Sequence, residues 1–239
     1  NVGDGSAPFL HTETLLTEPQ RQLADEVRLP LTAALLRSPR ERVLTTLYVR
    51  VAWDGRVALE TTLPITLLPV DEWFDDTQNN PWLPSFVLPR DPAVTKIIAT
   101  ARRHLVTLQD DPGAAFVGYQ AEEADPDDDG ERVDLQVQAI WTSLVQEYSL
   151  LYTNPPPAYS YRNQRLRTPS EILATCSGTC IDLALLLASC LEYVDIHPVI
   201  VLLSGHAFVG YWRKSTFHDQ FSSVSQVPPK LGIEIGPLS

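Results

Sequence analysis

Residues 177–187 read Ser177-Gly178-Thr179-Cys180-Ile181-Asp182-Leu183-Ala184-Leu185-Leu186-Leu187, and residues 204–208 read Ser204-Gly205-His206-Ala207-Phe208. The first stretch predicts a helix that begins at Cys180 and ends near Tyr193, because Thr179 or Ser177 can act as N-cap before a continuous apolar run. A strand is expected over 199–203, and a second strand is expected to begin at His206. The sequence therefore places a thiol at a helix N-terminus and an imidazole at the start of a strand.

These two positions are suited to nucleophilic catalysis. The first turn of a helix leaves backbone N–H groups unpaired, and the helix dipole favours negative charge, so a thiol at Cys180 would ionise readily. A histidine nearby can take the proton and later return it. The alternative interpretation is a small buried cysteine and an ordinary core histidine. We favour catalysis because Gly178 and Gly205 precede the two residues and would allow close backbone approach.

The segment from Arg167 to Trp212 resembles the core of the transglutaminase-like superfamily, whose members share a papain-like Cys-His-Asp arrangement. The resemblance lies in the Ser-Gly-Thr-Cys run, the acidic residue at 182, the apolar helix, the following strand and the His-Ala-Phe strand. It implies a thiol nucleophile at Cys180 and a general base at His206. Asp182 matches the acidic position, but in the first turn of a helix it also stabilises the dipole, so we interpret it as structural.

The resemblance further implies an acidic residue that orients the imidazole, as in other catalytic triads. Glu234 is the favoured candidate, because it lies in the next predicted strand, within Gly232-Ile233-Glu234-Ile235-Gly236. Asp219 is the alternative. It lies in a polar loop, where a solvated turn residue is the more common explanation for an aspartate. The predicted site is therefore Cys180, His206 and Glu234, with Asp219 in place of Glu234 as the second choice.

Composition limits the other function classes. The chain has 239 residues, enough for one large or two small domains, and is 44% hydrophobic, as in ordinary globular proteins. Its net charge of −12 argues against nucleic acid as a partner of this segment. No apolar run reaches the roughly 18 residues needed to span a bilayer, so no membrane partner is expected. Three cysteines without a framework spacing suit a reducing compartment, and we expect a cytoplasmic protein.

The sequence contains no methionine, not even at position 1. We therefore expect an excised piece of a longer polypeptide, with other domains of that polypeptide among its partners. The alternative is a chain whose methionines were modified residues missing from the sequence.

Two parts of the chain are expected, residues 1–72 and residues 73–239. In the first, period-two runs over 43–51 and 57–68 flank the hairpin signal Asp54-Gly55. Together with a third strand from 29–36, they predict a small antiparallel, sandwich-like β unit over 28–72, after a short helix at 18–27. The fold class is α+β.

The second part should hold a helical connection and the Cys-His module. Residues 73–91 are expected to be a tethered loop, and Asp91-Pro92 predicts a helix start that continues to about Leu108. An irregular acidic stretch should follow over 109–130, and a second helix over 133–148. A third helix is expected to begin at Pro169, after Thr168.

The sequence also contains two patterns that partly match metal sites, one for calcium and one for zinc. Residues 125–130 carry carboxylates at calcium-loop positions 1, 3 and 5, but position 12 is Gln136, so an acidic surface loop is favoured. A zinc site from Cys176, Cys180, His197 and His206 lacks the usual spacing. No metal or other cofactor is therefore expected. Cys190 is expected in the core.

Two features next to the module have alternative interpretations. Arg162, Arg165 and Arg167 are either a solvated loop or a rim that contacts substrate. Gln164 could donate to an oxyanion, although its spacing from Cys180 does not match that of papain-like enzymes.

The sequence thus predicts thiol-dependent acyl transfer, with hydrolysis of a protein or peptide substrate by a cysteine peptidase or amidase favoured over cross-linking. The alternative is a catalytically inactive domain of the same fold that serves protein interaction or regulation in a larger protein.

Overall fold

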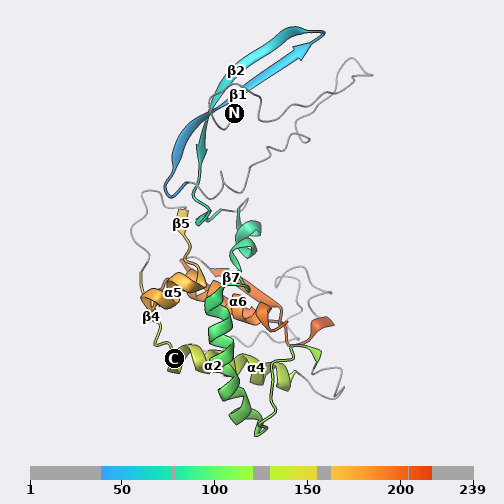
Figure 1. The fold of residues 1–239 in the computed structure, drawn as a ribbon, viewed down its shortest axis with the longest axis vertical. Coiled ribbons are helices and arrows are strands. Elements are labelled where there is room, and N and C mark those ends of the chain that lie inside the picture. The colour runs from blue at the N-terminus through green and yellow to red at the C-terminus, as the bar shows by residue number, and fades with distance from the viewer. Residues whose placement is uncertain (1–38, 77–78, 121–129, 155–162, 204, 217–239) are drawn as a thin grey trace. The chain divides into compact units, whose positions relative to one another are not determined.

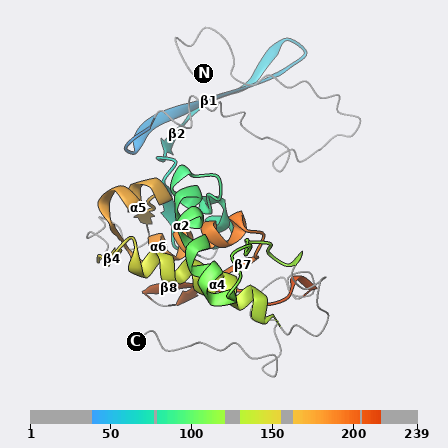
Figure 2. The ribbon, with the colours of Figure 1, turned by 60° about the horizontal axis from the view of Figure 1, so that its bottom comes forward.

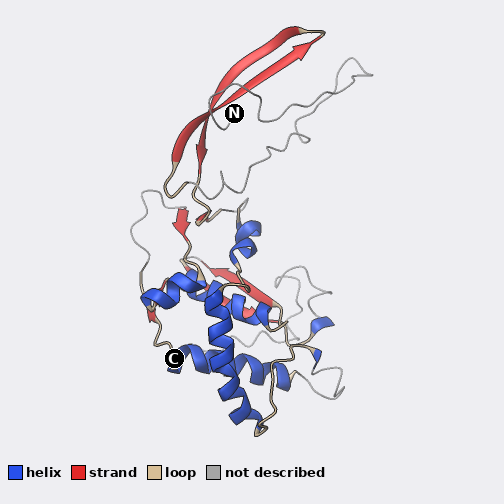
Figure 3. Ribbon diagram, in the orientation of Figure 1, coloured by secondary structure: helices blue, strands red, loops and turns tan. Residues whose placement is uncertain are grey.

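The structure is a computed structural model that describes residues 39–76, 79–120, 130–154, 163–203 and 205–216. The chain divides into two compact units, Asn1–Glu72 and Trp73–Ser239. Helices and small two-stranded sheets alternate along the described residues, which makes the protein α+β, as predicted (Figure 3). The expected helix at 18–27 and third strand at 29–36 lie outside the described residues.

The first unit contains a long antiparallel ribbon of β1 (Val43–Trp53) and β2 (Arg56–Leu67) (Figure 1). The turn residues Asp54 and Gly55 have φ of +49° and +74°, the left-handed pair that a type I′ turn requires. The sandwich-like expectation is not met by the described residues, because they form one two-stranded ribbon whose strands are mostly exposed.

The second unit is built around α2 (Pro92–Gln109), α4 (Glu131–Gln146) and α6 (Cys180–Tyr193) (Figures 1 and 2). Asp91 caps α2 by accepting a hydrogen bond of 2.8 Å from the backbone N–H of Ala93, as the Asp-Pro signal predicts. Helix α4 begins two residues earlier than expected, directly after Gly130, whose φ is +86°. The fully buried side chains of the main core come from all three helices and include Val94, Ile97, Ile140, Leu186 and Leu191.

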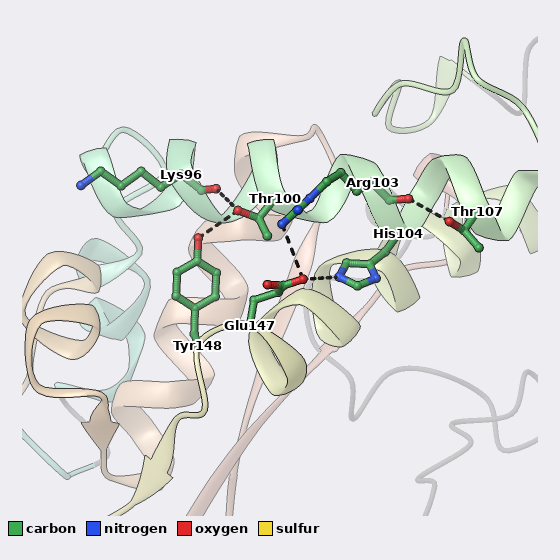
Figure 4. A network of polar contacts seen from close by, with 7 residues as sticks. All are labelled: Lys96, Thr100, Arg103, His104, Thr107, Glu147 and Tyr148. Carbon is green, nitrogen blue, oxygen red and sulfur yellow. Dashed lines mark hydrogen bonds and ion pairs between the residues drawn. The ribbon is translucent and has the colours of Figure 1, made fainter.

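A polar edge accompanies the packing of α2 against α4 (Figure 4). Arg103 Nη2 and His104 Nε2 each lie 3.5 Å from Glu147 Oε1, and the hydroxyls of Thr100 and Tyr148 are 3.2 Å apart. Arg103 and Glu147 are exposed, and ion pairs between exposed side chains contribute about 0–1 kcal/mol. The apolar core therefore decides how the two helices pack, and the polar edge adds little.

A buried glutamine organises the irregular stretch after α2. Gln136 is fully buried, and its Oε1 accepts hydrogen bonds of 2.9 Å from the backbone N–H groups of both Val117 and Gly118. Its Nε2 donates to the carbonyls of Gly118 (3.1 Å) and Arg132 (3.2 Å). Gly118 has a φ of +54°, and a Cβ there would lie 2.6 Å from the Val194 carbonyl oxygen. This stretch is thus irregular but closely packed.

Residues 73–91 are more ordered than the expected loop. They contain the end of β3 (Glu72–Phe74) and a 3₁₀ helix, η1 (Asn80–Phe86), whose Leu83 is 2% exposed. Pro81 and Pro84 explain the difference, since a proline lacks the N–H that a continuous α-helix needs but tolerates a short 3₁₀ turn. Beyond η1, the Leu88 N–H donates to Ser189 Oγ of α6 at 2.9 Å.

The remaining elements surround α6. Helix α5 (Pro169–Thr175) begins with the predicted cap Thr168. The short strand β4 (Leu151–Tyr152) pairs in parallel with β6 (Ser177–Gly178), and β5 (Asn163–Arg165) pairs with β3. Strands β7 (Pro198–Leu203) and β8 (His206–Tyr211) form an antiparallel hairpin that packs on α6.

Candidate functional site

The N-terminus of α6 is held by a reciprocal cap. Thr179 Oγ1 accepts a hydrogen bond of 3.4 Å from the Asp182 N–H, and Asp182 Oδ2 accepts one of 3.0 Å from the Thr179 N–H. The other carboxylate oxygen, Oδ1, accepts from the Arg167 N–H at 2.9 Å. Asp182 is 1% exposed, so both its oxygens are satisfied in the interior. The structural role predicted for Asp182 is confirmed.

Cys180 is the first residue of α6, as predicted, and it is half-buried. It packs against a second apolar cluster, here called the Trp73 cluster, whose buried members are Trp73, Leu83, Leu166, Ile181, Leu185 and Ala207. The other two cysteines have different surroundings. Cys176 is exposed, whereas Cys190 is buried in the main core, as predicted. Burial raises the pKa of the Cys190 thiol to about 12, so Cys190 is not suited to nucleophilic attack.

The two glycines before the candidate residues have different roles. A Cβ at Gly178 would lie 3.1 Å from both Asp182 Cβ and Leu183 Cδ2, so this glycine does allow close packing against α6. Gly205 meets no atom within 4 Å among the described residues, and its φ is +76°. The expectation of close approach is therefore wrong for Gly205, which instead supplies the left-handed conformation at the tip of the hairpin.

His206 is the first residue of β8 and pairs with Leu203 across the hairpin. The next residue, Ala207, is 5% exposed and belongs to the Trp73 cluster, which also contacts Cys180. Thus the start of β8 and the start of α6 meet in one cluster. Because side chains alternate along a strand, His206 projects to the face opposite Ala207, where it is exposed.

The predicted triad is not assembled by hydrogen bonds within the described residues. Neither the Cys180 thiol nor the His206 ring has a hydrogen bond or ion pair with another part of the chain that the structure describes. Glu234 and Asp219, the two candidates for the third residue, lie outside the described residues. Catalytic hydrogen bonds are often long in unliganded enzymes and tighten when substrate binds.

Polar groups surround the start of α6. Gln164 Nε2 donates a hydrogen bond of 2.9 Å to Thr179 Oγ1, so its side chain lies directly beside the N-cap of the Cys180 helix. Thr153, just after β4, donates its N–H to the Gly178 carbonyl at 2.9 Å, and its buried Oγ1 has no partner in the described part of the chain. Thr153 could not be identified from the sequence, because two-residue strands carry no periodic pattern.

The three arginines next to the module do not share one setting in the structure. Arg167 is half-buried, and its Nη1 donates to the Ser177 carbonyl at 3.0 Å and to Ser177 Oγ at 3.3 Å. Arg167 therefore supports β6, the strand that leads into Cys180. Arg165 is exposed on β5, and Arg162 lies outside the described residues.

In the ranges that the structure describes, no three His, Cys, Asp or Glu side chains come close enough together to hold a metal ion. Residues 125–129 of the weighed calcium loop lie outside them. The helices described here are too short or too polar to cross a membrane.

Comparison of the chain with protein-family models, with curated proteins and with solved structures gives no match.

Proposed function

We propose that the protein catalyses thiol-dependent acyl transfer through a transglutaminase-like Cys-His module, with hydrolysis of a peptide or protein amide as its reaction. One observation carries the proposal. Cys180 is a half-buried thiol on the first turn of α6, and it packs on the Trp73 cluster, which also holds Ala207, the residue after His206 in β8. A helix N-terminus favours the thiolate over the thiol.

The chemistry assigns one role to each residue. The Cys180 thiolate attacks the amide carbon, and the Cys180 backbone N–H donates to the oxyanion that forms. The protonated His206 gives its proton to the leaving amine as the carbon–nitrogen bond breaks. Water then attacks the thioester and His206 takes a proton from this water. The carboxylic acid and the Cys180 thiolate are released, which restores the thiolate and the protonated His206.

The proposed mechanism requires the His206 side chain to change its orientation. Its ring projects from the face of β8 opposite Ala207, so it has to rotate around the end of the β7–β8 hairpin to reach the Cys180 sulfur. The exposed position of His206 and the left-handed Gly205 beside it leave room for this change. Glu234, or Asp219 in its place, would then orient the imidazole from behind.

Competitive labelling with iodoacetamide near pH 6.5 tests the nucleophile. If exposure alone governed reactivity, the exposed Cys176 would react before the half-buried Cys180. We expect the reverse order, because the proposed mechanism makes Cys180 the attacking thiol and His206 the base that takes its proton. Cys190 should react only on unfolding. Faster labelling of Cys176, or no labelling of Cys180 in the folded protein, would refute the enzyme proposal.

Substitutions test the base and its orienting residue. His206→Ala should slow Cys180 labelling at neutral pH at least tenfold, since general acid–base assistance contributes about 10²–10⁴-fold to many reactions. His104→Gln, on α2, is the matched control and should leave the rate unchanged. Glu234→Gln should slow labelling more than Asp219→Asn does. The opposite order would assign the third position to Asp219.

The second candidate function is a catalytically inactive domain of this fold, used for protein interaction or regulation within a larger protein. It is favoured because neither the Cys180 thiol nor the His206 ring has a hydrogen bond or ion pair within the described residues. In that case Cys180 would label no faster than an exposed model thiol, and His206→Ala would have no effect.

A further inference from the structure

A cavity of about 580 Å³ opens between η1, the C-terminal end of α6 and β7. Its apolar wall comes from two elements, with Leu83 and Val87 on the η1 side and Ile200 and Leu202 on β7. The volume falls within the range of about 300–1,000 Å³ that is usual for sites of small ligands and short peptide segments.

The charged end of the cavity lies away from Cys180. Glu192, one of the lining residues, is twelve positions along α6 from Cys180, which corresponds to about 18 Å at 1.5 Å per residue. The apolar wall is shared with the Cys180 site, because Leu83 belongs to the Trp73 cluster and Val87, Ile200 and Leu202 pack against it. Binding can therefore be tested by substituting Glu192, which leaves the side chains around the thiol unchanged.

The polar part of the cavity consists of hydrogen-bond acceptors and negative charge. Asn80 lines it, and Asn80 Oδ1 is a buried acceptor with no hydrogen-bond partner in the described residues. Glu192 and Asp195 line the same cavity and are exposed to solvent, so both carboxylates are accessible to a ligand. No lysine or arginine is among the lining residues that the structure describes.

These features select the chemistry of a ligand. Two carboxylates without a neighbouring cation in the lining favour a positive charge and repel an anion. The leucine, valine and isoleucine wall favours an apolar side chain beside that charge. His197, also in the lining, has its ring against Tyr119, with the ring centroids 5.3 Å apart.

We propose that this cavity binds a peptide segment in which a lysine or arginine side chain neighbours an apolar residue. The cation lies between Glu192 and Asp195, while the apolar residue contacts Leu83 and Ile200. The net charge of the chain, −12, strengthens the attraction of cationic peptides over longer distances.

An NMR titration tests the proposal. The isotope-labelled full chain is titrated with the peptide Ac-Ala-Lys-Leu-Ala-NH₂, and the chemical shifts of its backbone amides are measured. The shifts should concentrate on η1, β7 and residues 192–198. The same peptide with an Nε-acetylated lysine is the neutral control, and we expect it to bind at least fivefold more weakly. Equal binding of the two peptides, or shifts spread over the whole protein, would overturn the proposal.

Variants separate the cavity from general charge attraction. Glu192→Gln and Asp195→Asn should each weaken binding at least threefold. Asp195 has a φ of +62°, a conformation that asparagine also tolerates, so the variant should fold. Asp110→Asn is the matched control, because Asp110 is an exposed aspartate with a φ of +50° at the end of α2, outside the cavity lining. An equal loss in Asp110→Asn would show attraction by net charge alone and would refute the site.

Discussion

Gln136 is the side chain on which the irregular stretch before α4 depends most. It uses both lone pairs of Oε1 and both protons of Nε2, and all four partners are backbone groups. A fully buried amide with every bond made fixes one conformation of its surroundings, because any other conformation would leave polar groups unpaired.

Replacing Gln136 should therefore destabilise the protein strongly. Gln136→Leu keeps the approximate volume but leaves the N–H groups of Val117 and Gly118 without an acceptor. Each unsatisfied buried group costs about 1–3 kcal/mol, so the unfolding free energy should fall by about 2–5 kcal/mol. Urea denaturation measures this change, with Gln146→Leu at the exposed end of α4 as control. A loss below about 1 kcal/mol would contradict the role assigned to Gln136.

Cys190 should give the protein a specific sensitivity to alkali. Burial raises the pKa of its thiol from 9.0 to about 12 in the folded state, so the folded protein favours the neutral thiol. The stabilising contribution is complete below pH 9 and is lost as the pH rises toward 12. In this window the unfolding free energy should fall by about 1.4 kcal/mol per pH unit.

The measurement is urea denaturation between pH 9 and 10, compared with Cys190→Ala. The alanine variant is less stable at every pH because of the cavity it leaves, but its pH slope should be shallower. Tyr211 contributes only above this window. Burial and its hydrogen bond to Asp134 raise the pKa of the folded Tyr211, so its stabilising contribution is lost only as the pH rises above the ordinary value of 10.0, at which the unfolded side chain ionises. Identical slopes would show that Cys190 is ionised or accessible in the folded state.

At the scale of single elements, the start of α6 depends on Thr179. Thr179→Ala removes the acceptor for both the Asp182 N–H and the Gln164 amide, so we expect a loss of about 1–2 kcal/mol in unfolding free energy. Thr179→Ser keeps the hydroxyl and should lose less than about 0.5 kcal/mol. If the alanine variant equalled the serine variant, the reciprocal cap would not stabilise α6.

The elements that the sequence predicted well are those with local signals. Helix α6 begins at Cys180 and ends at Tyr193, as predicted, because the cap and the apolar run lie within the helix itself. The β1–β2 ribbon follows from Asp54-Gly55 and a period of two. In both cases the information lies within a few residues of the element.

Other features depend on residues far apart in the sequence and could not be predicted. The pairing of β4 with β6 joins Leu151 to Ser177 through two-residue strands without a pattern. The buried bonds of Gln136 reach 18 residues back to Gly118. At the candidate site, the sequence located Cys180 and His206 on their elements, but the orientation of His206 results from the packing of Ala207 on α6.

At the scale of the whole molecule, the division into two units predicts that residues 73–239 fold without residues 1–72. The main core and the Trp73 cluster are drawn entirely from the second unit. A fragment of residues 73–239 should unfold cooperatively, with a Tm within about 5 °C of the transition of the full chain. Its Cys180 labelling rate should be unchanged. A fragment without a cooperative transition would show that the first unit is needed for folding.

The two units should also acquire their structure at different speeds. The β1–β2 ribbon joins neighbours in the sequence through a two-residue turn, and hairpins of this kind form in about 1–10 μs. The second unit has to bring Leu88 to Ser189, across 101 residues, before its core can close. On refolding, the spectroscopic signal of β structure should therefore appear before Trp73 becomes buried. During that interval the β1–β2 ribbon of the first unit would be formed while the second unit is still unfolded.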